Sequence, residues 1–355
     1  MCQPLSASPI VPFSQRLLPA LRGKGFAMDG YWVWGGSVVL GQDGRYHLFV
    51  SRWPKRYPFF HGYLAASEVV RASADTPEGP FQFEQVVLPA RGSEHWDGRM
   101  THNPRIVRCG QDYLLFYIGA NYAGPTPEPA EMHRLRATDH GPNGRMFDWY
   151  HAIRIGIARS RSVFGPWQRA DAPALDSRPG TRSPVVTNPS PCLGPDGRLL
   201  LYYRCEGKLW LAGTDGPDRP LGHLGDGPVV APGPGLRIED PCAWWAGDHY
   251  EMVCKDLTGK ITGEYHAAVH LLSPDGRTWQ LAPQPKAWSR KLDWSDGSRT
   301  TQGSIERPFV LLRDGRPAYL YVATADGPGP SDHPRRPGHY HAENTWNQVI
   351  PLRQP

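Results

Sequence analysis

The stretch that decides the fold is Arg237-Ile238-Glu239-Asp240-Pro241-Cys242-Ala243-Trp244-Trp245-Ala246-Gly247-Asp248-His249-Tyr250-Glu251-Met252-Val253. Two carboxylates stand directly before a proline, and an apolar run follows that proline. A Gly247-Asp248 turn then leads into a second apolar run, which is the pattern of a β-hairpin. The stretch therefore predicts a strand, a tight turn and a second strand, with both carboxylates at the start of the first strand.

The same layout recurs along the chain, with a different residue before the apolar run each time. Four units are marked by Asn103-Pro104, Asn188-Pro189, Asp240-Pro241 and Arg307-Pro308, and Gly36 is the nearest equivalent in the first unit. Successive marks lie 67, 85, 52 and 67 residues apart. Repeated units of about four short strands are typical of propeller blades. The sequence therefore predicts an all-β, five-bladed β-propeller with four antiparallel strands in each blade.

Composition and the N-terminus limit the domain organisation and the partners. Residues 1–26 are Pro-rich and irregular and are expected to form an N-terminal arm, whereas residues 27–355 form the propeller. The net charge of +5 is small and no block of five like charges occurs, which argues against a nucleic-acid partner. No charged segment followed by a long apolar run opens the chain, so we expect no signal peptide, no membrane association and a cytoplasmic location.

The six cysteines include no CxxC pair, which argues against a zinc knuckle or a redox motif. Four of them fall in predicted strands, where we expect buried free thiols. Disulfides between Cys192 and Cys205, or between Cys242 and Cys254, stay open because each pair could face across a hairpin.

Polar residues at the entry to the inner strands define a candidate site. The innermost strands of a propeller line its central channel, so residues that lead into them gather at one mouth. The candidates are Asp29, Trp34, Trp96, Asp97, His102, Asn103, Asn188, Glu239, Asp240, His266, Glu306 and Arg307. Glycoside hydrolysis needs a carboxylic acid that protonates the leaving oxygen and a carboxylate that acts as base or nucleophile. Structural roles are the alternative: Asp240 could cap a turn and Glu306 could pair with Arg307.

Five short strings together resemble a known group of enzymes. They are Trp96-Asp97-Gly98-Arg99-Met100-Thr101-His102-Asn103-Pro104, Ser51-Arg52-Trp53-Pro54, Thr187-Asn188-Pro189-Ser190, Ile238-Glu239-Asp240-Pro241 and Ile305-Glu306-Arg307-Pro308. Over residues 28–352 the chain is similar to bacterial five-bladed propeller glycoside hydrolases of families 43 and 117, and more distantly of family 32. The resemblance implies a base Asp, a pKa-tuning Asp and a general acid Glu around the channel, with inversion at the anomeric carbon.

The resemblance carries over to individual residues as follows. Asp240 matches the tuning Asp and Glu306 matches the acid. Gly35-Gly36 occupies the place of the base Asp, so Asp97 is predicted to be the base instead, and Asp29 is the next candidate. The resemblance also includes a neoagarobiose-type branch in which a histidine is the acid, so His102 or His266 competes with Glu306.

The sequence thus predicts a glycoside hydrolase that cleaves a terminal glycosidic bond of an oligosaccharide, which makes residues 27–355 the catalytic domain. The predicted catalytic residues are Asp97, Asp240 and Glu306, and the predicted substrate-binding residues are Asp29, Trp34, Trp96, His102, Asn103, Asn188, Glu239, His266 and Arg307. The missing first-unit Asp motivates an alternative, a non-catalytic carbohydrate-binding propeller. No cofactor is expected; the resemblance alone allows a divalent cation such as calcium in the channel. His333, His339 and His341 stand in a Pro/Gly-rich stretch and are interpreted as loop residues.

Overall fold

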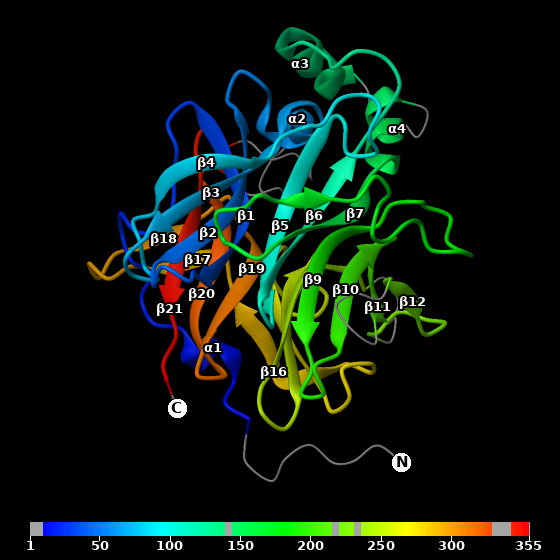
Figure 1. Ribbon diagram of the computed structural model, residues 1–355. Coiled ribbons are helices and arrows are strands. Elements are labelled where there is room, and N and C mark those ends of the chain that lie inside the picture. The colour runs from blue at the N-terminus through cyan, green and yellow to red at the C-terminus, as the bar shows by residue number, and fades with distance from the viewer. Residues whose placement is uncertain (1–9, 139–143, 215–219, 231–235, 329–341, 355) are drawn as a thin grey trace.

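The computed structural model describes residues 10–138, 144–214, 220–230, 236–328 and 342–354, so His333, His339 and His341 lie outside the described residues. Its strands form five antiparallel sheets that are arranged as the blades of a propeller (Figure 1). Four sheets have four strands, ordered as they occur in the chain, and the fifth has three. The prediction of a five-bladed β-propeller is therefore confirmed.

The blades follow the chain in order. The first contains β1 (Tyr31–Leu40), β2 (Tyr46–Pro54), β3 (Glu68–Ala74) and β4 (Gln82–Leu88), and the second contains β5 (Met100–Cys109), β6 (Asp112–Ala120), β7 (Arg154–Ser160) and β8 (Gln168–Arg169). The third contains β9 (Thr187–Leu193), β10 (Leu199–Cys205), β11 (Lys208–Thr214) and β12 (Gly222–Leu224). The fourth contains β13 (Ile238–Trp245), β14 (Tyr250–Asp256), β15 (Ala268–Ser273) and β16 (Gln280–Trp288), and the fifth contains β19 (Ser304–Arg313), β20 (Arg316–Ala325) and β21 (Thr345–Pro351). A separate hairpin, β17 (Lys291–Asp293) and β18 (Arg299–Thr301), precedes the fifth blade.

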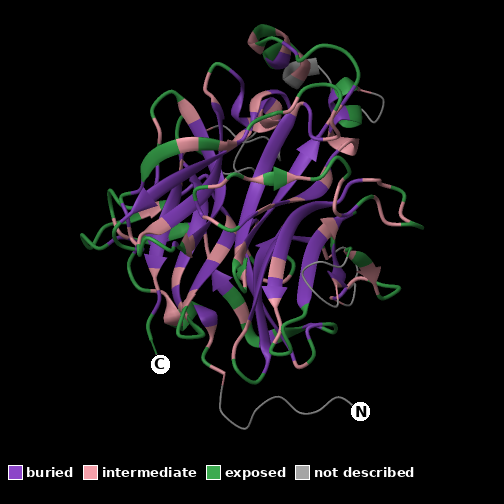
Figure 2. Cartoon of the chain, viewed as in Figure 1, coloured by how far each residue is buried: buried purple, intermediate pink, exposed green. Residues whose placement is uncertain are grey.

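In the first four blades, burial falls from the innermost strand to the outermost strand, and Figure 2 shows the exposed outer strand β4 of the first blade. The outermost strand of the fifth blade, β21, is mostly buried. In the first blade, β1 and β2 are buried over most of their length, whereas β4 is mostly exposed. The inner strands read as continuous apolar runs because neighbouring blades cover both of their faces. This pattern explains why the inner strands are the clearest signal in the sequence.

The described part of the N-terminal segment contacts both the fourth and the fifth blade. The backbone N–H of Phe26 donates to Asn347 O at 2.9 Å, and the N–H of Asn347 donates back to Phe26 O at 2.8 Å, on the outer edge of β21. In α1 (Phe13–Arg16), Phe13 is fully buried against Trp244 and Trp288. The segment thereby supplies pairing that a fourth strand would give to the last sheet.

Three helices gather at one end of the propeller, opposite α1 (Figure 1). Helix α2 (Phe59–Ala66) connects β2 to β3, and α3 (Pro129–Thr138) and α4 (Arg145–His151) lie in the long insertion between β6 and β7. No helix among the described residues is long and apolar enough to cross a membrane. Cys109, Cys192, Cys205, Cys242 and Cys254 are free thiols, so neither hairpin disulfide forms.

A β-bulge interrupts the innermost strand of every blade at the same place. At each bulge the first residue after the regular register has a positive φ, namely Gly35 (68°), Asn103 (51°), Asn188 (56°), Asp240 (61°) and Arg307 (53°); we call these five the ring residues. In the first blade the next residue, Gly36, has a positive φ as well (119°). A bulge redirects the side chains that flank it. Gly35, rather than the predicted Gly36, is thus the first-blade equivalent of Asn103, because the shift in β1 falls between Trp34 and Ser37.

Candidate active site

A cavity of about 610 Å³ lies at the end of the channel that faces the helices. Its floor contains the residue that precedes each ring residue, one from each blade: Trp34, His102, Thr187, Glu239 and Glu306. Helix α2 contributes Phe59 and Tyr63 to the wall, and α4 contributes Phe147 and Tyr150. Most of the apolar and aromatic side chains therefore come from the first two blades and their helices, whereas every carboxylate and ammonium or guanidinium group comes from the last three blades.

The ring residues are joined by hydrogen bonds beneath this floor. Asn103 Nδ2 donates to Asn188 Oδ1 at 3.2 Å, and Asn188 Nδ2 donates to Asp240 Oδ1 at 2.7 Å. Arg307 Nη1 donates to the same oxygen of Asp240 at 2.5 Å. Gly35 adds no side chain, and Asn103 Oδ1 on that side is buried without a hydrogen-bond partner among the described residues. The ring is thus closed through four blades and open at the first.

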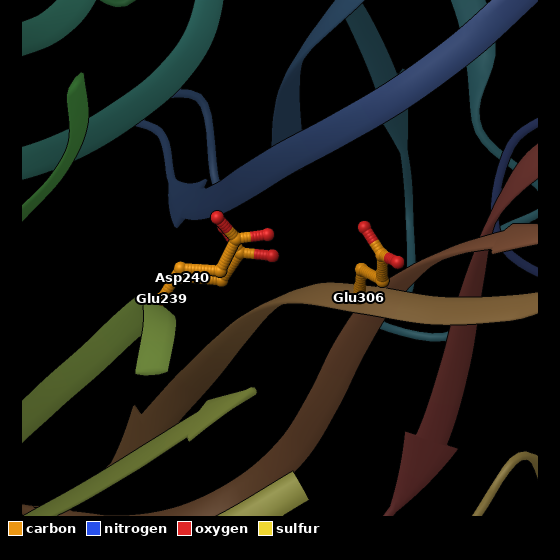
Figure 3. A group of neighbouring side chains, drawn as sticks. All are labelled: Glu239, Asp240 and Glu306. Atoms are coloured by element: carbon orange, nitrogen blue, oxygen red, sulfur yellow. The ribbon is translucent and has the colours of Figure 1, made fainter. Parts of the chain in front are cut away.

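Three carboxylates converge where the fourth and fifth blades meet. Glu239 and Asp240 come from β13 and Glu306 comes from β19, and Figure 3 shows their carboxylates on the same side of the two strands. One oxygen from each lies within 4.8 Å of the others. Glu239 and Glu306 line the cavity, whereas Asp240 is 1% exposed and lies in the layer below.

Lys255, the cross-strand partner of Glu239 on β14, lies among these carboxylates. Its Nζ is 2.5 Å from Glu239 Oε1, 2.8 Å from Glu306 Oε2 and 3.6 Å from Asp240 Oδ2. The guanidinium of Arg204 lies 2.9 Å from Glu239 Oε2. Among the described residues, the three carboxylates therefore lie close to three permanent cations, Lys255, Arg204 and Arg307.

These contacts decide which carboxyl groups are ionised. Burial opposes ionisation of Glu239, but Lys255 and Arg204 outweigh it and lower the pKa of Glu239 to about 2. Burial likewise opposes ionisation of Glu306, but the charge of Lys255 and a hydrogen bond from His266 hold its pKa well below the usual range. For Asp240, burial prevails over Arg307 and raises the pKa. Both cavity carboxylates are thus anions at neutral pH.

The two histidines of the cavity differ in environment. His102 is stacked on Tyr63, with ring centroids 4.7 Å apart, and its Nδ1 shares a hydrogen bond with Ser67 Oγ. Burial and the nearby charge of Arg307 lower the pKa of His102 well below its usual value, so this ring is neutral. His266 has a positive φ of 61°, is stacked on Tyr265 and has its Nδ1 3.4 Å from Glu306 Oε1.

The loop that carries His266 is organised by one buried carboxylate, Asp256, at the end of β14. Its two oxygens accept backbone N–H groups from residues 258, 259, 261 and 262 at 2.9–3.0 Å, and both threonine hydroxyls of that segment at 3.1–3.2 Å. The backbone N–H of His266 donates to Asp256 O. This loop presents Leu257, Tyr265 and His266 to the cavity.

Most of the predicted site residues meet in the cavity or directly beneath it. These are Trp34, His102, Asn103, Asn188, Glu239, Asp240, His266, Glu306 and Arg307. Three others lie elsewhere. Asp29 is exposed beside the N-terminal segment, and Trp96 is stacked on Tyr117 with its Nε1 donating to Ala170 O.

Asp97, the predicted base, is also outside the cavity. It is fully buried, Arg91 lies 2.6 Å from one oxygen, and Arg169 and the Tyr117 hydroxyl lie 3.1 and 2.8 Å from the other. Asp97 is thus fully buried outside the cavity with both oxygens paired, which favours a structural role over the predicted role as base.

Sequence reasoning found Arg307 but missed the other two cations of the site, Lys255 and Arg204, and the helical wall of the cavity. Lys255 and Arg204 reach the carboxylates from second strands, which carry none of the Pro-marked motifs. Counting back from the Gly247-Asp248 turn places Lys255 opposite Asp240, and the bulge then shifts its partner to Glu239, so the hairpin register indicated the position of Lys255 to within one residue. Phe59, Tyr63 and Tyr150 belong to connections that carry no motif.

A divalent cation does not fit among these carboxylates as the chain is folded. Calcium takes six to eight oxygen ligands at about 2.3–2.6 Å. The ammonium of Lys255 already lies within 2.8 Å of both Glu239 and Glu306. An ion in contact with the same oxygens would overlap this ammonium and repel it.

Comparison with solved structures places this geometry in a known fold. BT0996, in a complex with RGII, superimposes with a TM-score of 0.64 at 12% identity, covering 97% of this chain and 94% of that one. Zg3597, a family 117 glycoside hydrolase from the marine bacterium Zobellia galactanivorans, gives a TM-score of 0.62 at 14% identity over 96% and 92%. The fold is that of glycoside hydrolase families 43 and 117.

The likeness extends to a family 43 enzyme with a bound sugar. CoXyl43, a β-xylosidase/α-arabinofuranosidase from a compost metagenome in complex with xylotriose, gives a TM-score of 0.54 at 12% identity over 97% and 96% of the two chains. No protein-family model matches the sequence, and no curated protein matches it significantly. The resemblance to families 43 and 117 in fold is confirmed, at a level of sequence identity that concerns the fold alone.

Proposed function

We propose that this protein is a glycoside hydrolase that removes a terminal sugar from an oligosaccharide bound in the cavity. The observation that carries the proposal is the meeting of two ionised carboxylates, Glu239 and Glu306, with His266 on the floor of a cavity walled by aromatic rings. Sugars bind to such walls through their apolar faces. The fold is shared with hydrolases, among which CoXyl43 binds xylotriose.

The proposed proton donor is His266 rather than Glu306. Glu306 is an anion at neutral pH, because Lys255 and His266 overcome the effect of its burial on its pKa. His102 is neutral and hydrogen-bonded to Ser67, which leaves it unsuited to protonate a leaving group. His266 lines the cavity, and its Nδ1 lies 3.4 Å from Glu306 Oε1. Glu306 thereby acts as a positioning residue for His266.

The proposed nucleophile is Glu239. A carboxylate with a pKa of about 2 is a weak base at neutral pH but stays ionised for attack on the anomeric carbon. A Glu239 oxygen forms a bond to that carbon while the bond to the leaving oxygen breaks, and the leaving oxygen takes a proton from His266. Water then gives its proton to His266 and displaces Glu239. Two displacements retain the anomeric configuration, in contrast to the inversion that the resemblance implied.

The experiment compares wild type with Glu239→Gln and His266→Gln on nitrophenyl glycosides and on plant and algal oligosaccharides. Loss of Glu239 should lower kcat at least 1,000-fold on every substrate. Loss of His266 should affect oligosaccharides far more than nitrophenyl glycosides, because nitrophenolate leaves without a proton. Proton NMR of the first product identifies its anomer. Turnover that survives Glu239→Gln would contradict the proposal, and Asp97→Asn serves as the matched carboxylate control outside the cavity.

The second candidate function is a non-catalytic carbohydrate-binding propeller. The specific observation in its favour is Gly35, which leaves the first-blade ring position without a carboxylate. Detectable binding of an oligosaccharide by calorimetry, with no turnover on any member of the panel, would favour this candidate over the hydrolase.

A further inference from the structure

Lys255 is buried at the centre of the acidic cluster. The residue is 3% exposed, and its Nζ lies 2.5 Å from Glu239, 2.8 Å from Glu306 and 3.6 Å from Asp240. Lysine is among the residues that are almost never fully buried unless they are paired. Here one ammonium contacts carboxylates of two blades, so it ties β13 to β19 through its own strand, β14.

Charge compensation explains why an ammonium is needed at this point. Arg204 neutralises Glu239 from one side, and Arg307 neutralises Asp240 from the layer below. Glu306 has its ion-pair contacts with Lys255 and His266 instead. Without Lys255, the three buried carboxylates of the described cluster would therefore share two permanent cations. An uncompensated buried charge is strongly unfavourable.

We infer that Lys255 is a built-in cation that occupies the place of a divalent metal ion among Glu239, Asp240 and Glu306. The three carboxylates offer hard oxygen donors within 4.8 Å of one another, which is the donor set that calcium prefers. The ammonium group of Lys255 places a positive charge next to the same carboxylate oxygens. The wild-type cluster then has no affinity for divalent cations, and removal of the ammonium creates a cation site.

The test is calcium binding by Lys255→Met, which keeps much of the side-chain volume and removes the charge. Isothermal titration with CaCl₂ should show one site in this variant and none in the wild type, with a dissociation constant of about 10⁻⁷–10⁻³ M, the range of calcium sensors and extracellular modules. Calcium should also raise the thermal midpoint of this variant and leave that of the wild type unchanged. Neither measurement depends on hydrolysis, so the test of this inference is independent of the proposed function.

Matched variants make the result decisive. Lys255→Arg keeps a positive charge and should not bind calcium, and Lys255→Met combined with Glu306→Gln should lose most of the binding that Lys255→Met gains. If Lys255→Met is poorly folded alone, calcium in the refolding buffer should restore its circular dichroism, and magnesium should do so less well because it demands a stricter geometry. Absence of calcium binding by folded Lys255→Met, or absence of any calcium effect on the unfolded variant, would overturn the inference. Calcium binding by the wild type that Glu306→Gln abolishes would overturn it as well.

Discussion

The buried carboxylate of Asp256 gives a prediction that connects loop structure to ligand binding. The perturbation is Asp256→Asn, which keeps one acceptor oxygen and places an NH₂ group against N–H and O–H donors. Each oxygen of Asp256 accepts three hydrogen bonds, so the substitution removes about half of the six. At about 1.5 kcal/mol for each bond to a charged acceptor, the loop over residues 257–266 loses roughly 4 kcal/mol.

The loss should appear in the loop before it appears in the fold. A destabilisation of roughly 4 kcal/mol is enough to populate open forms of a segment whose local stability is of that order. If the closed form falls to about a tenth of the molecules, the apparent affinity for a cavity ligand falls tenfold. We therefore expect KM for the best substrate of the panel to rise about tenfold, because Tyr265 and His266 leave the cavity when the loop opens.

Hydrogen exchange measured by mass spectrometry is the primary assay. Peptides that cover residues 257–266 should exchange at least 100-fold faster in Asp256→Asn, while peptides from β13 and β14 keep their protection. Asp275→Asn is the matched control: Asp275 also accepts backbone N–H groups, from Arg277 and Thr278, but in the β15–β16 turn at the other end of the blade. Unchanged exchange over 257–266, or an equal rise of KM in both variants, would refute the reasoning.

Three further predictions concern stability and follow from single contacts. Asp97→Asn should lower the unfolding free energy by about 3–5 kcal/mol, because the charges of two buried guanidinium groups are then no longer compensated. The value of kcat per folded molecule should not change, and a large loss of kcat would show that Asp97 is catalytic after all. Glu239, whose pKa falls from 4.5 to about 2 on folding, should contribute about 3 kcal/mol that is present above pH 4.5 and lost as the pH falls to 2. Urea midpoints between pH 6 and 2.5 should therefore fall less steeply for Glu239→Gln than for wild type, and parallel curves would contradict the assignment. Gly35→Asn should be neutral or stabilising by about 1 kcal/mol, because a new amide reaches the unpartnered Asn103 Oδ1 and the φ of 68° suits asparagine. Gly36→Ala should destabilise the protein, since a Cβ at residue 36 meets neighbouring atoms at 3.0 Å. Denaturant midpoints that rank the two variants in the opposite order would exclude this account.

The sequence alone determined the number of blades and most of the channel residues. Each inner strand carries its own bulge, and in four of five blades a proline follows the residue with positive φ. Such a signal is local, so it can be read without knowing which segments pair. Once five bulges are aligned, rotational symmetry brings Asn103, Asn188, Asp240 and Arg307 around one axis.

Only the tertiary structure decided the chemistry of the site. Lys255 acts on Glu306 across a blade boundary, and Asp97 is withdrawn from the cavity by Arg91 and Arg169, which lie 6 and 72 residues away in the chain. The ionisation of a carboxylate depends on burial and on charges within a few ångströms, whatever their separation in sequence. Spacing along the chain records strand order and turn position, but these cross-blade distances exist only after the propeller closes.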